Sequence, residues 1–218
     1  MIYQAFNKLI LSLLILLVFG CAKEPPAQES CNFVQNQFGR RVSWARLPIQ
    51  FYADSSVTDR QFHVIRESMQ VWNDHFDRPV FEMIGRAPQL PTPRLNPDGK
   101  VLPDGFNGLY IASEGDFENS TFRDEQARAS ISFRGDFIYE CDILVDGSEK
   151  FFYENEDGPM AQGRIHFKSL IIHELGHCLG LDHIEEVNSV MAPILPPGFH
   201  PSRVELSETD FESLACQY

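Results

Sequence analysis

The chain has 218 residues, a charged fraction of 22% and a formal net charge of −13. An acidic surface of this kind argues against nucleic acid and against anionic lipid headgroups as partners, because both repel it. The length suffices for one domain with a sizeable apolar core.

The first twenty residues have the pattern of a targeting segment. Lys8 supplies a positive charge, and residues 9–19 form an apolar run. That run is shorter than the roughly 20 residues needed to span a bilayer and suits a secretory signal peptide. A buried core helix is the weaker interpretation, because a polar, Pro-rich stretch follows directly. We therefore expect residues 1–20 to be a signal peptide.

The end of this segment, Val18-Phe19-Gly20-Cys21, resembles the lipobox of bacterial lipoproteins, whose signal is cleaved before a cysteine that becomes lipidated. The resemblance implies a lipid on Cys21, a membrane as partner through that lipid, and export to the bacterial cell envelope. Ala22 follows the cysteine, which favours the outer membrane. We expect residues 21–41 to be the lipidated cysteine with its tether and residues 42–218 to be the domain. Plain secretion is the alternative.

Hydrophobic periodicity predicts strands and helices in the rest of the chain. The expected strands cover residues 47–52, 80–84, 109–112, 129–133 and 137–145. Residues 86–105 and 146–163 are expected to be long loops. The expected helices cover residues 58–76 and 164–179, and a last helix begins near Ser207. This order predicts one α/β or α+β domain.

Local signals set the ends of these helices. In the first helix, Thr58 and Gln61 have the spacing of a capping box, and Pro79 forbids continuation much beyond residue 78. Its apolar stripe, expected to face the core, consists of Phe62, Ile65, Met69, Trp72 and Phe76. Gly180 is placed to end the second helix, and Asp210 to cap the last.

Four cysteines besides Cys21 are Cys31, Cys141, Cys178 and Cys216. In an exported protein they predict two disulfides, and three pairings are possible. Their wide spacing does not resemble a zinc knuckle.

The stretch HELGHCLGLDH at residues 173–183 predicts a metal centre. His173 and His177 stand one helical turn apart, so two imidazole nitrogens can reach one ion. His183 joins them if the chain turns at Gly180. Three neutral imidazoles suit zinc best, although copper and nickel also bind imidazole, and they leave a position for a water that becomes a nucleophile near neutral pH. Glu174, roughly 100° around the helix, can act as general base.

An HExxH pattern alone also occurs by chance in unrelated helices; Gly180 and His183 at the right positions make chance improbable. The stretch resembles the HExxHxxGxxH signature of the metzincin metallopeptidases, in which a methionine turn follows. Here Ser189-Val-Met-Ala-Pro follows, with Met191. Among metzincins the chain is most similar to the matrixins, through the helix with Trp72, the strand Glu140-Cys-Asp-Ile-Leu-Val and the closing LSETDFESLACQY.

The resemblance covers roughly residues 42–218 and implies roles and a fold. His173, His177 and His183 would bind one catalytic Zn²⁺, Glu174 would be the base, and Met191 would be the apolar floor beneath the ion. The implied fold is a twisted, mostly parallel sheet with one antiparallel edge strand, an active-site helix and a C-terminal helix. The edge strand within residues 129–133 would bind a protein or peptide substrate as an extended strand.

The resemblance also bears on the other candidate sites. Its terminal helix packs near the active-site helix, which favours the pairs Cys178–Cys216 and Cys31–Cys141. We expect no second zinc, because the remaining histidines are scattered: His63, His75, His166 and His200. Acidic residues in the loops at 98–125 and 146–157 could hold calcium, but a solvated acidic loop explains them equally well. The matrixin latency motif PRCGxPD does not occur.

Two functions remain as hypotheses. The first is a zinc endopeptidase. The second is a proteolytically inactive zinc-binding envelope protein that keeps the scaffold to bind proteins. The presence of Glu174 favours the enzyme, because inactive relatives typically lose the base. A zinc enzyme with a non-peptide substrate fits the three histidines but not the methionine turn.

Overall fold

The computed structural model describes residues 26–87, 101–112, 125–147, 151–152 and 163–218. The expected signal peptide at residues 1–20, the lipidation at Cys21, and much of the two expected loops lie outside these residues. Within the described part, no helix is both long and apolar enough to cross a membrane.

A six-stranded sheet forms the centre of the domain, with the order β1-β6-β4-β2-β3 and with β5 paired to β6. Its strands are β1 (Ser43–Trp44), β2 (Ile49–Ala53), β3 (Phe81–Arg86), β4 (Gly108–Ala112), β5 (Ala127–Arg134) and β6 (Phe137–Asp146). The pairs β1–β6, β2–β3, β2–β4 and β4–β6 are parallel, whereas β5 runs antiparallel to β6. Each strand predicted from the sequence has a counterpart here; the short β1 was missed.

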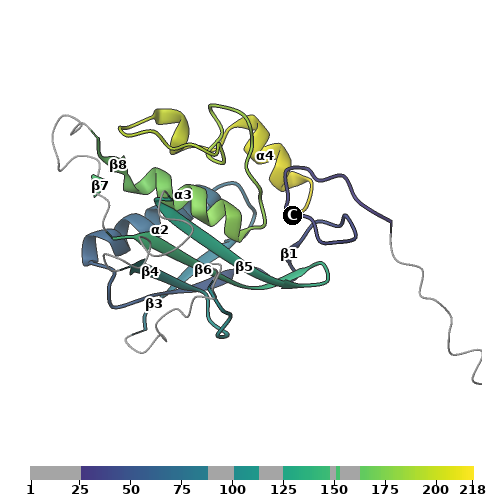
Figure 1. Ribbon diagram of the computed structural model, residues 1–218, viewed down its shortest axis with the longest axis horizontal. Coiled ribbons are helices and arrows are strands. Elements are labelled where there is room, and N and C mark those ends of the chain that lie inside the picture. Colours follow the sequence, from purple (N-terminus) through teal and green to yellow (C-terminus); the bar gives the residue numbers. More distant parts are fainter. Residues whose placement is uncertain (1–25, 88–100, 113–124, 148–150, 153–162) are drawn as a thin grey trace, which may run out of the picture.

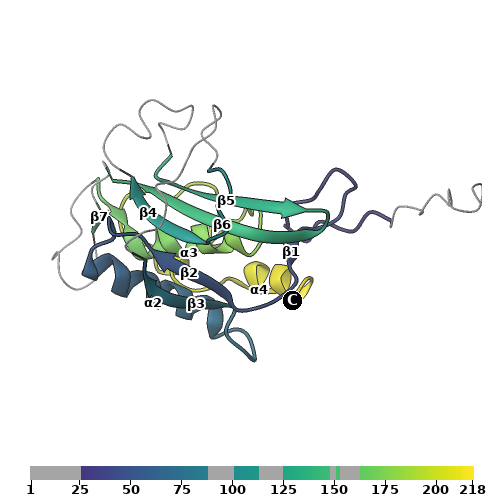
Figure 2. The same ribbon diagram turned by 90° about the horizontal axis from the view of Figure 1, so that it is seen from below.

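Helices α2 (Asp59–Asn73) and α3 (Phe167–Cys178) pack against each other on one face of the sheet (Figure 1; Figure 2). Together they enclose the main core, in which Trp72 of α2 is fully buried. The short helix α4 (Glu208–Ala215) closes the chain. This arrangement is a mixed α/β domain.

The first helix begins as expected but ends early. Thr58 and Gln61 form the predicted capping box. The helix stops at Asn73, well before Pro79, because the Asn73 side chain donates to the Phe81 carbonyl at 3.0 Å and accepts from the Val80 N–H at 2.8 Å. The Asn73 side chain therefore ends α2 and also holds Val80 and Phe81, where β3 begins.

Helix α3 also differs from the expected range of residues 164–179. Ile165 and His166 form strand β8 (Ile165–His166), which pairs with β7 (Phe151–Phe152), so the helix begins at Phe167. Gly180 ends it as predicted, with a φ of 98° that favours glycine. A side chain there would also collide with the Val42 carbonyl, 2.5 Å from the position of a Cβ.

The opposite face of the sheet holds a smaller apolar cluster and two buried carboxylates. Glu140 accepts the Asp104 and Gly105 N–H groups at 2.8 and 2.6 Å, and Asp142 accepts the Gly108 N–H at 2.9 Å. Because a buried carboxylate is costly without hydrogen bonds, these contacts fix the loop that precedes β4 onto the sheet. This face carries no part of the HELGHCLGLDH stretch.

The expected tether at residues 21–41 is wrong for its last part. Phe33 is 2% exposed and belongs to the core, and it forms an antiparallel bridge with Leu181. The preceding Cys31 is disulfide-bonded to Cys216. The domain therefore includes this segment and does not begin at residue 42, because an aromatic side chain and a disulfide hold the segment against it.

The disulfide pairing implied by the matrixin resemblance is also wrong. The structure pairs Cys31 with Cys216 and Cys141 with Cys178. The reason is that Cys178 faces the sheet, where α3 packs on β6, and Cys141 lies on the same side of β6; both are fully buried. Cys216, at the end of α4, instead meets the N-terminal segment.

Candidate metal centre

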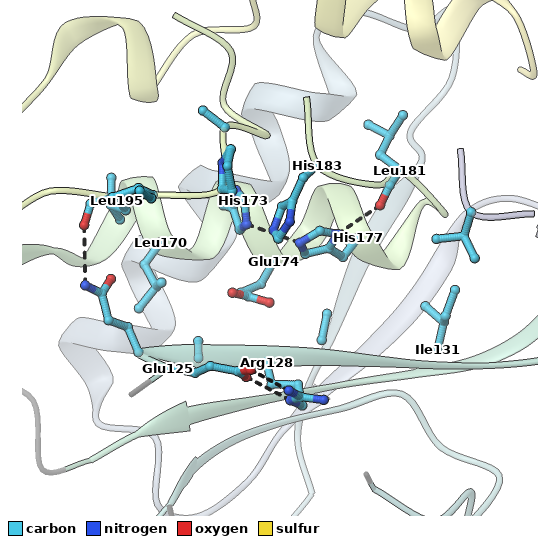
Figure 3. Close-up of a pocket in the computed structure, with 17 residues that line it drawn as sticks. Glu125, Arg128, Ile131, Leu170, His173, Glu174, His177, Leu181, His183 and Leu195 are labelled. Carbon is cyan, nitrogen blue, oxygen red and sulfur yellow. Dashed lines mark hydrogen bonds and ion pairs between the residues drawn. The ribbon is translucent and has the colours of Figure 1, made fainter. Parts of the chain in front are cut away.

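His173 and His177 project from one side of α3, one turn apart. Their Nε2 atoms lie 3.1 Å from each other (Figure 3). The Nδ1 atoms contact backbone carbonyls, that of His173 at Val190 and that of His177 at Leu181, each at 2.8 Å. A carbonyl can only accept, so each Nδ1 carries the proton and each Nε2 presents a lone pair to the other.

Two lone pairs this close repel unless a cation lies between them. Nitrogen ligands arranged tetrahedrally at about 2.0–2.1 Å from zinc lie roughly 3.3 Å apart. The observed Nε2 separation of 3.1 Å is near that value. The donor set of the two helical histidines therefore fits a zinc ion.

The third histidine arrives from the segment after Gly180. The ring centroid of His183 lies 5.3 Å from that of His173 and 4.9 Å from that of His177. The candidate ligand atoms of the three residues all lie within 4.8 Å of one another. In contrast to buried His173, His183 is exposed, so the group opens to solvent on one side.

Burial keeps the helical imidazoles neutral. Burial is the main reason that the pKa of His177 falls to about 4; His183 contributes to the fall, and the hydrogen bond with Leu181 opposes it. Burial also holds the pKa of His173 well below its usual range, and His177 adds to that effect. Only neutral imidazole can bind a metal, so both side chains are in the ligand form at neutral pH.

Glu174 points from the other side of α3 toward β5 (Figure 3) and is 4% exposed. Burial raises its pKa to about 8, and a hydrogen bond from the Ala129 backbone N–H opposes that rise. Glu125 and Arg128, which form an ion pair at 2.5 Å, lie beyond it and act in opposite directions on this pKa. Glu174 is thus a buried acid–base group beside the three histidines.

Met191 packs against α3 at Gly176. A Cβ on Gly176 would lie 2.2 Å from the Met191 Sδ atom and 2.9 Å from the Trp72 ring. Only glycine permits Met191 and Trp72 to approach the helix this closely. A glycine inside a helix lowers stability by about 1 kcal/mol relative to alanine. The sequence reasoning missed Gly176; a glycine inside an apolar helix was the available signal.

A buried carboxylate holds the Met191 segment in place. Asp210, fully buried in α4, accepts the Ser189 hydroxyl at 2.5 Å and the Val190 N–H at 3.0 Å. Arg203 donates to the carbonyls of Ser189 and Ala192 from the other side. Val190 is the residue whose carbonyl contacts His173, so this network supports a candidate ligand. The capping role of Asp210 was predicted, but this second role was not.

A cleft of about 480 Å³ runs past the histidines. Its walls come from the N-terminal segment, β5, α3 and residues 192–195. The side chain of Gln126 bridges the cleft by donating to the Leu195 carbonyl at 3.3 Å (Figure 3). The apolar lining residues are Val34, Ala127, Ala129, Ile131, Leu170, Leu181, Ala192, Pro193, Ile194 and Leu195.

The other histidines take separate positions. His63 lies near Glu67, His75 packs on Phe211, and His166 contacts the Ser169 hydroxyl at 2.7 Å. Among the described residues, no second group of three or more His, Cys, Asp or Glu side chains is close enough to share an ion. Most of the acidic loop residues considered for calcium lie outside the described part of the chain.

Comparisons with known proteins support a metallopeptidase family. The family model described as Matrixin (Peptidase_M10) matches residues 112–218, a range that contains α3, His183 and Met191. Matrix metalloproteinase-21 of Cynops pyrrhogaster is 25% identical over 186 residues. That match covers 85% of this chain but only 26% of the relative. These similarities support a matrixin-like catalytic domain.

Proposed function

We propose that the protein is a zinc-dependent endopeptidase. The observation that carries the proposal is the convergence of three imidazoles, two of them neutral, beside a buried glutamate in an open cleft. The alternative is a zinc-binding protein without proteolytic activity, which would use the same three histidines.

His173 and His177 would hold the ion through their Nε2 atoms, and His183 through one ring nitrogen. Zinc bound there supplies a Lewis acid and lowers the pKa of water toward about 7. The Val190 and Leu181 carbonyls fix the orientation of two of the rings. Met191 and Gly176 form a close-packed apolar floor, which keeps that part of α3 rigid.

Glu174 is the general base in this proposal. Its carboxylate accepts a proton from the attacking water and passes it to the nitrogen of the leaving amine. Burial raises its pKa to about 8, and a dication on the neighbouring histidines favours the carboxylate and opposes that rise. The ionised carboxylate that the dication would favour is the form that accepts a proton.

The substrate is a peptide segment in extended conformation. Strand β5 pairs with β6 on one side, and several of its side chains line the cleft on the other. An unpaired strand edge offers backbone hydrogen bonds to an added strand. Leu170 and residues 192–195 form an apolar wall of the cleft, which favours a substrate with an apolar side chain next to the cleaved bond.

Export to an oxidising compartment accompanies this function. Two disulfides, Cys31–Cys216 and Cys141–Cys178, support it. The lipobox-like Val18–Cys21 sequence supports a lipid anchor in a bacterial envelope. Residues 22–218 exported behind an ordinary secretory signal would then be recovered from the soluble fraction while the parent stays with the membranes, and equal recovery of the two would contradict the anchor.

The experiment that tests the enzymatic proposal is Glu174→Ala. The variant should bind zinc as the parent does, because no ligand is changed, and its rate of peptide cleavage should fall by at least about 100-fold. Zinc content and cleavage of an unfolded protein are measured on the same samples. Undiminished cleavage by the variant would contradict the role of Glu174, and zinc binding without cleavage by the parent would identify the alternative.

A further inference from the structure

The exposed third histidine is held differently from the two helical ones. Within the described residues no hydrogen bond reaches the His183 ring, whereas the rings of His173 and His177 each contact a carbonyl. Its position therefore depends on the backbone of residues 180–182, which links it to the end of α3.

That backbone is paired with the N-terminal segment at both of its ends. The Val34 N–H donates to the Gly180 carbonyl at 2.9 Å, and the Asp182 N–H donates to the Asn32 carbonyl at 2.7 Å. Between them, Phe33 and Leu181 form an antiparallel bridge. The Leu181 carbonyl also contacts the His177 Nδ1 atom. The pairing of residues 32–34 with residues 180–182 therefore affects the positions of two of the three histidines.

The N-terminal segment is itself fixed to α4. Cys31 is bonded to Cys216, and the Asn32 side chain donates to the Ser213 hydroxyl at 2.8 Å. Cys31 and Asn32 both have positive φ values, 46° and 60°, which non-glycine residues adopt only where surrounding contacts hold them. The segment and the helix lie together beside the C-terminus (Figure 1).

We propose that residues 31–34 are a positioning element for the third zinc ligand, with the Cys31–Cys216 disulfide as its clamp. The inference rests on the proposed zinc site. The disulfide fixes the segment on α4, the segment fixes residues 180–182 as a short added strand, and that strand sets the place of His183. No residue of this element touches the ion.

The test is the double variant Cys31→Ser/Cys216→Ser, which removes the clamp without leaving a free thiol. Loss of an outer support of a metal ligand weakens metal binding by about 10–100-fold, so the zinc dissociation constant should rise by at least about tenfold. In the metal-free protein, hydrogen exchange at the Asp182 amide should become faster. The visible spectrum of the cobalt(II)-loaded variant should change, because it reports the arrangement of the ligands.

The matched control is Asn36→Ala, in the same segment. It removes the contacts of Asn36 with Gly135 and Asp136 in the β5–β6 turn but leaves the pairing with residues 180–182, so zinc affinity and the cobalt spectrum should stay at parental values. Native affinity, spectrum and Asp182 exchange in the double serine variant would overturn the inference. Failure of the parent itself to bind zinc would instead overturn the proposed function, and the exchange measurement would still decide the role of the clamp.

Discussion

The candidate centre joins two regions that are built in different ways. His173 and His177 lie on a buried helix between the sheet and the Met191 segment, and their spacing follows from the helical repeat. His183 lies on an exposed turn whose place depends on pairing with residues nearly 150 positions earlier in the sequence, at 32–34. The helical pair is therefore specified locally, and the turn ligand by long-range contacts.

The largest effect is expected when one ligand is removed from each region. His173→Ala and His183→Ala should each weaken zinc binding by more than about 100-fold, since a ligand matters more than its outer support. Only His173→Ala should also lower the melting temperature of the metal-free protein, because it leaves a cavity and an unpaired Val190 carbonyl in the core. Calorimetry measures the melting temperatures of both metal-free variants. Equal melting temperatures would contradict the distinction.

A smaller effect is expected at Asp210, which supports the helical region from outside. Asp210→Ala leaves buried donors of Ser189 and Val190 unpaired and should lower the free energy of unfolding by about 2–4 kcal/mol. Zinc binding should weaken as well, because Val190 orients His173. Denaturant unfolding is the measurement, and Glu212→Ala, an exposed change on the same helix, is the control with an effect within about 0.5 kcal/mol. A stability loss as small as that of the control would show that the network is dispensable.

The smallest effect concerns the face of the sheet remote from the centre. Burial raises the pKa of Asp142 to about 7, so between pH 4 and pH 7 the folded state binds more protons than the unfolded state. Asp142 therefore contributes stability that is lost as pH rises through this window. Asp142→Asn should remove this contribution, so that the free energy of unfolding changes with pH differently from the parent, and should leave zinc binding unchanged. Unfolding measured at pH 5 and pH 8 tests this, and identical pH dependence in parent and variant would refute it.

The same contrast explains what the sequence could predict. The i and i+4 histidines, the turn at Gly180 and the capping boxes at Thr58 and Ser207 are local patterns, and the structure contains each of them. The helical repeat also places Glu174 roughly 100° around α3 from His173. These features need only the helical repeat and the rules for helix ends.

The errors all depend on contacts between different elements of the fold. The disulfide pairing depends on which side of α3 faces the sheet and on where α4 meets the N-terminal segment, and no local pattern encodes either. For the same reason the sequence predicts a tether over residues 21–41, although Cys31 and Phe33 within it offer a thiol and an apolar anchor. The end of α2 at Asn73 was missed because it depends on contacts of that side chain with β3.

The central claim is that zinc held by the three histidines enables this chain to cleave peptides. The most direct measurement removes metal from the purified protein with a chelator and follows cleavage of a peptide library as zinc is returned. The account predicts no cleavage without metal and full recovery at one zinc per chain. Cleavage that persists in excess chelator, or a metal-loaded protein that cleaves no peptide, would contradict it.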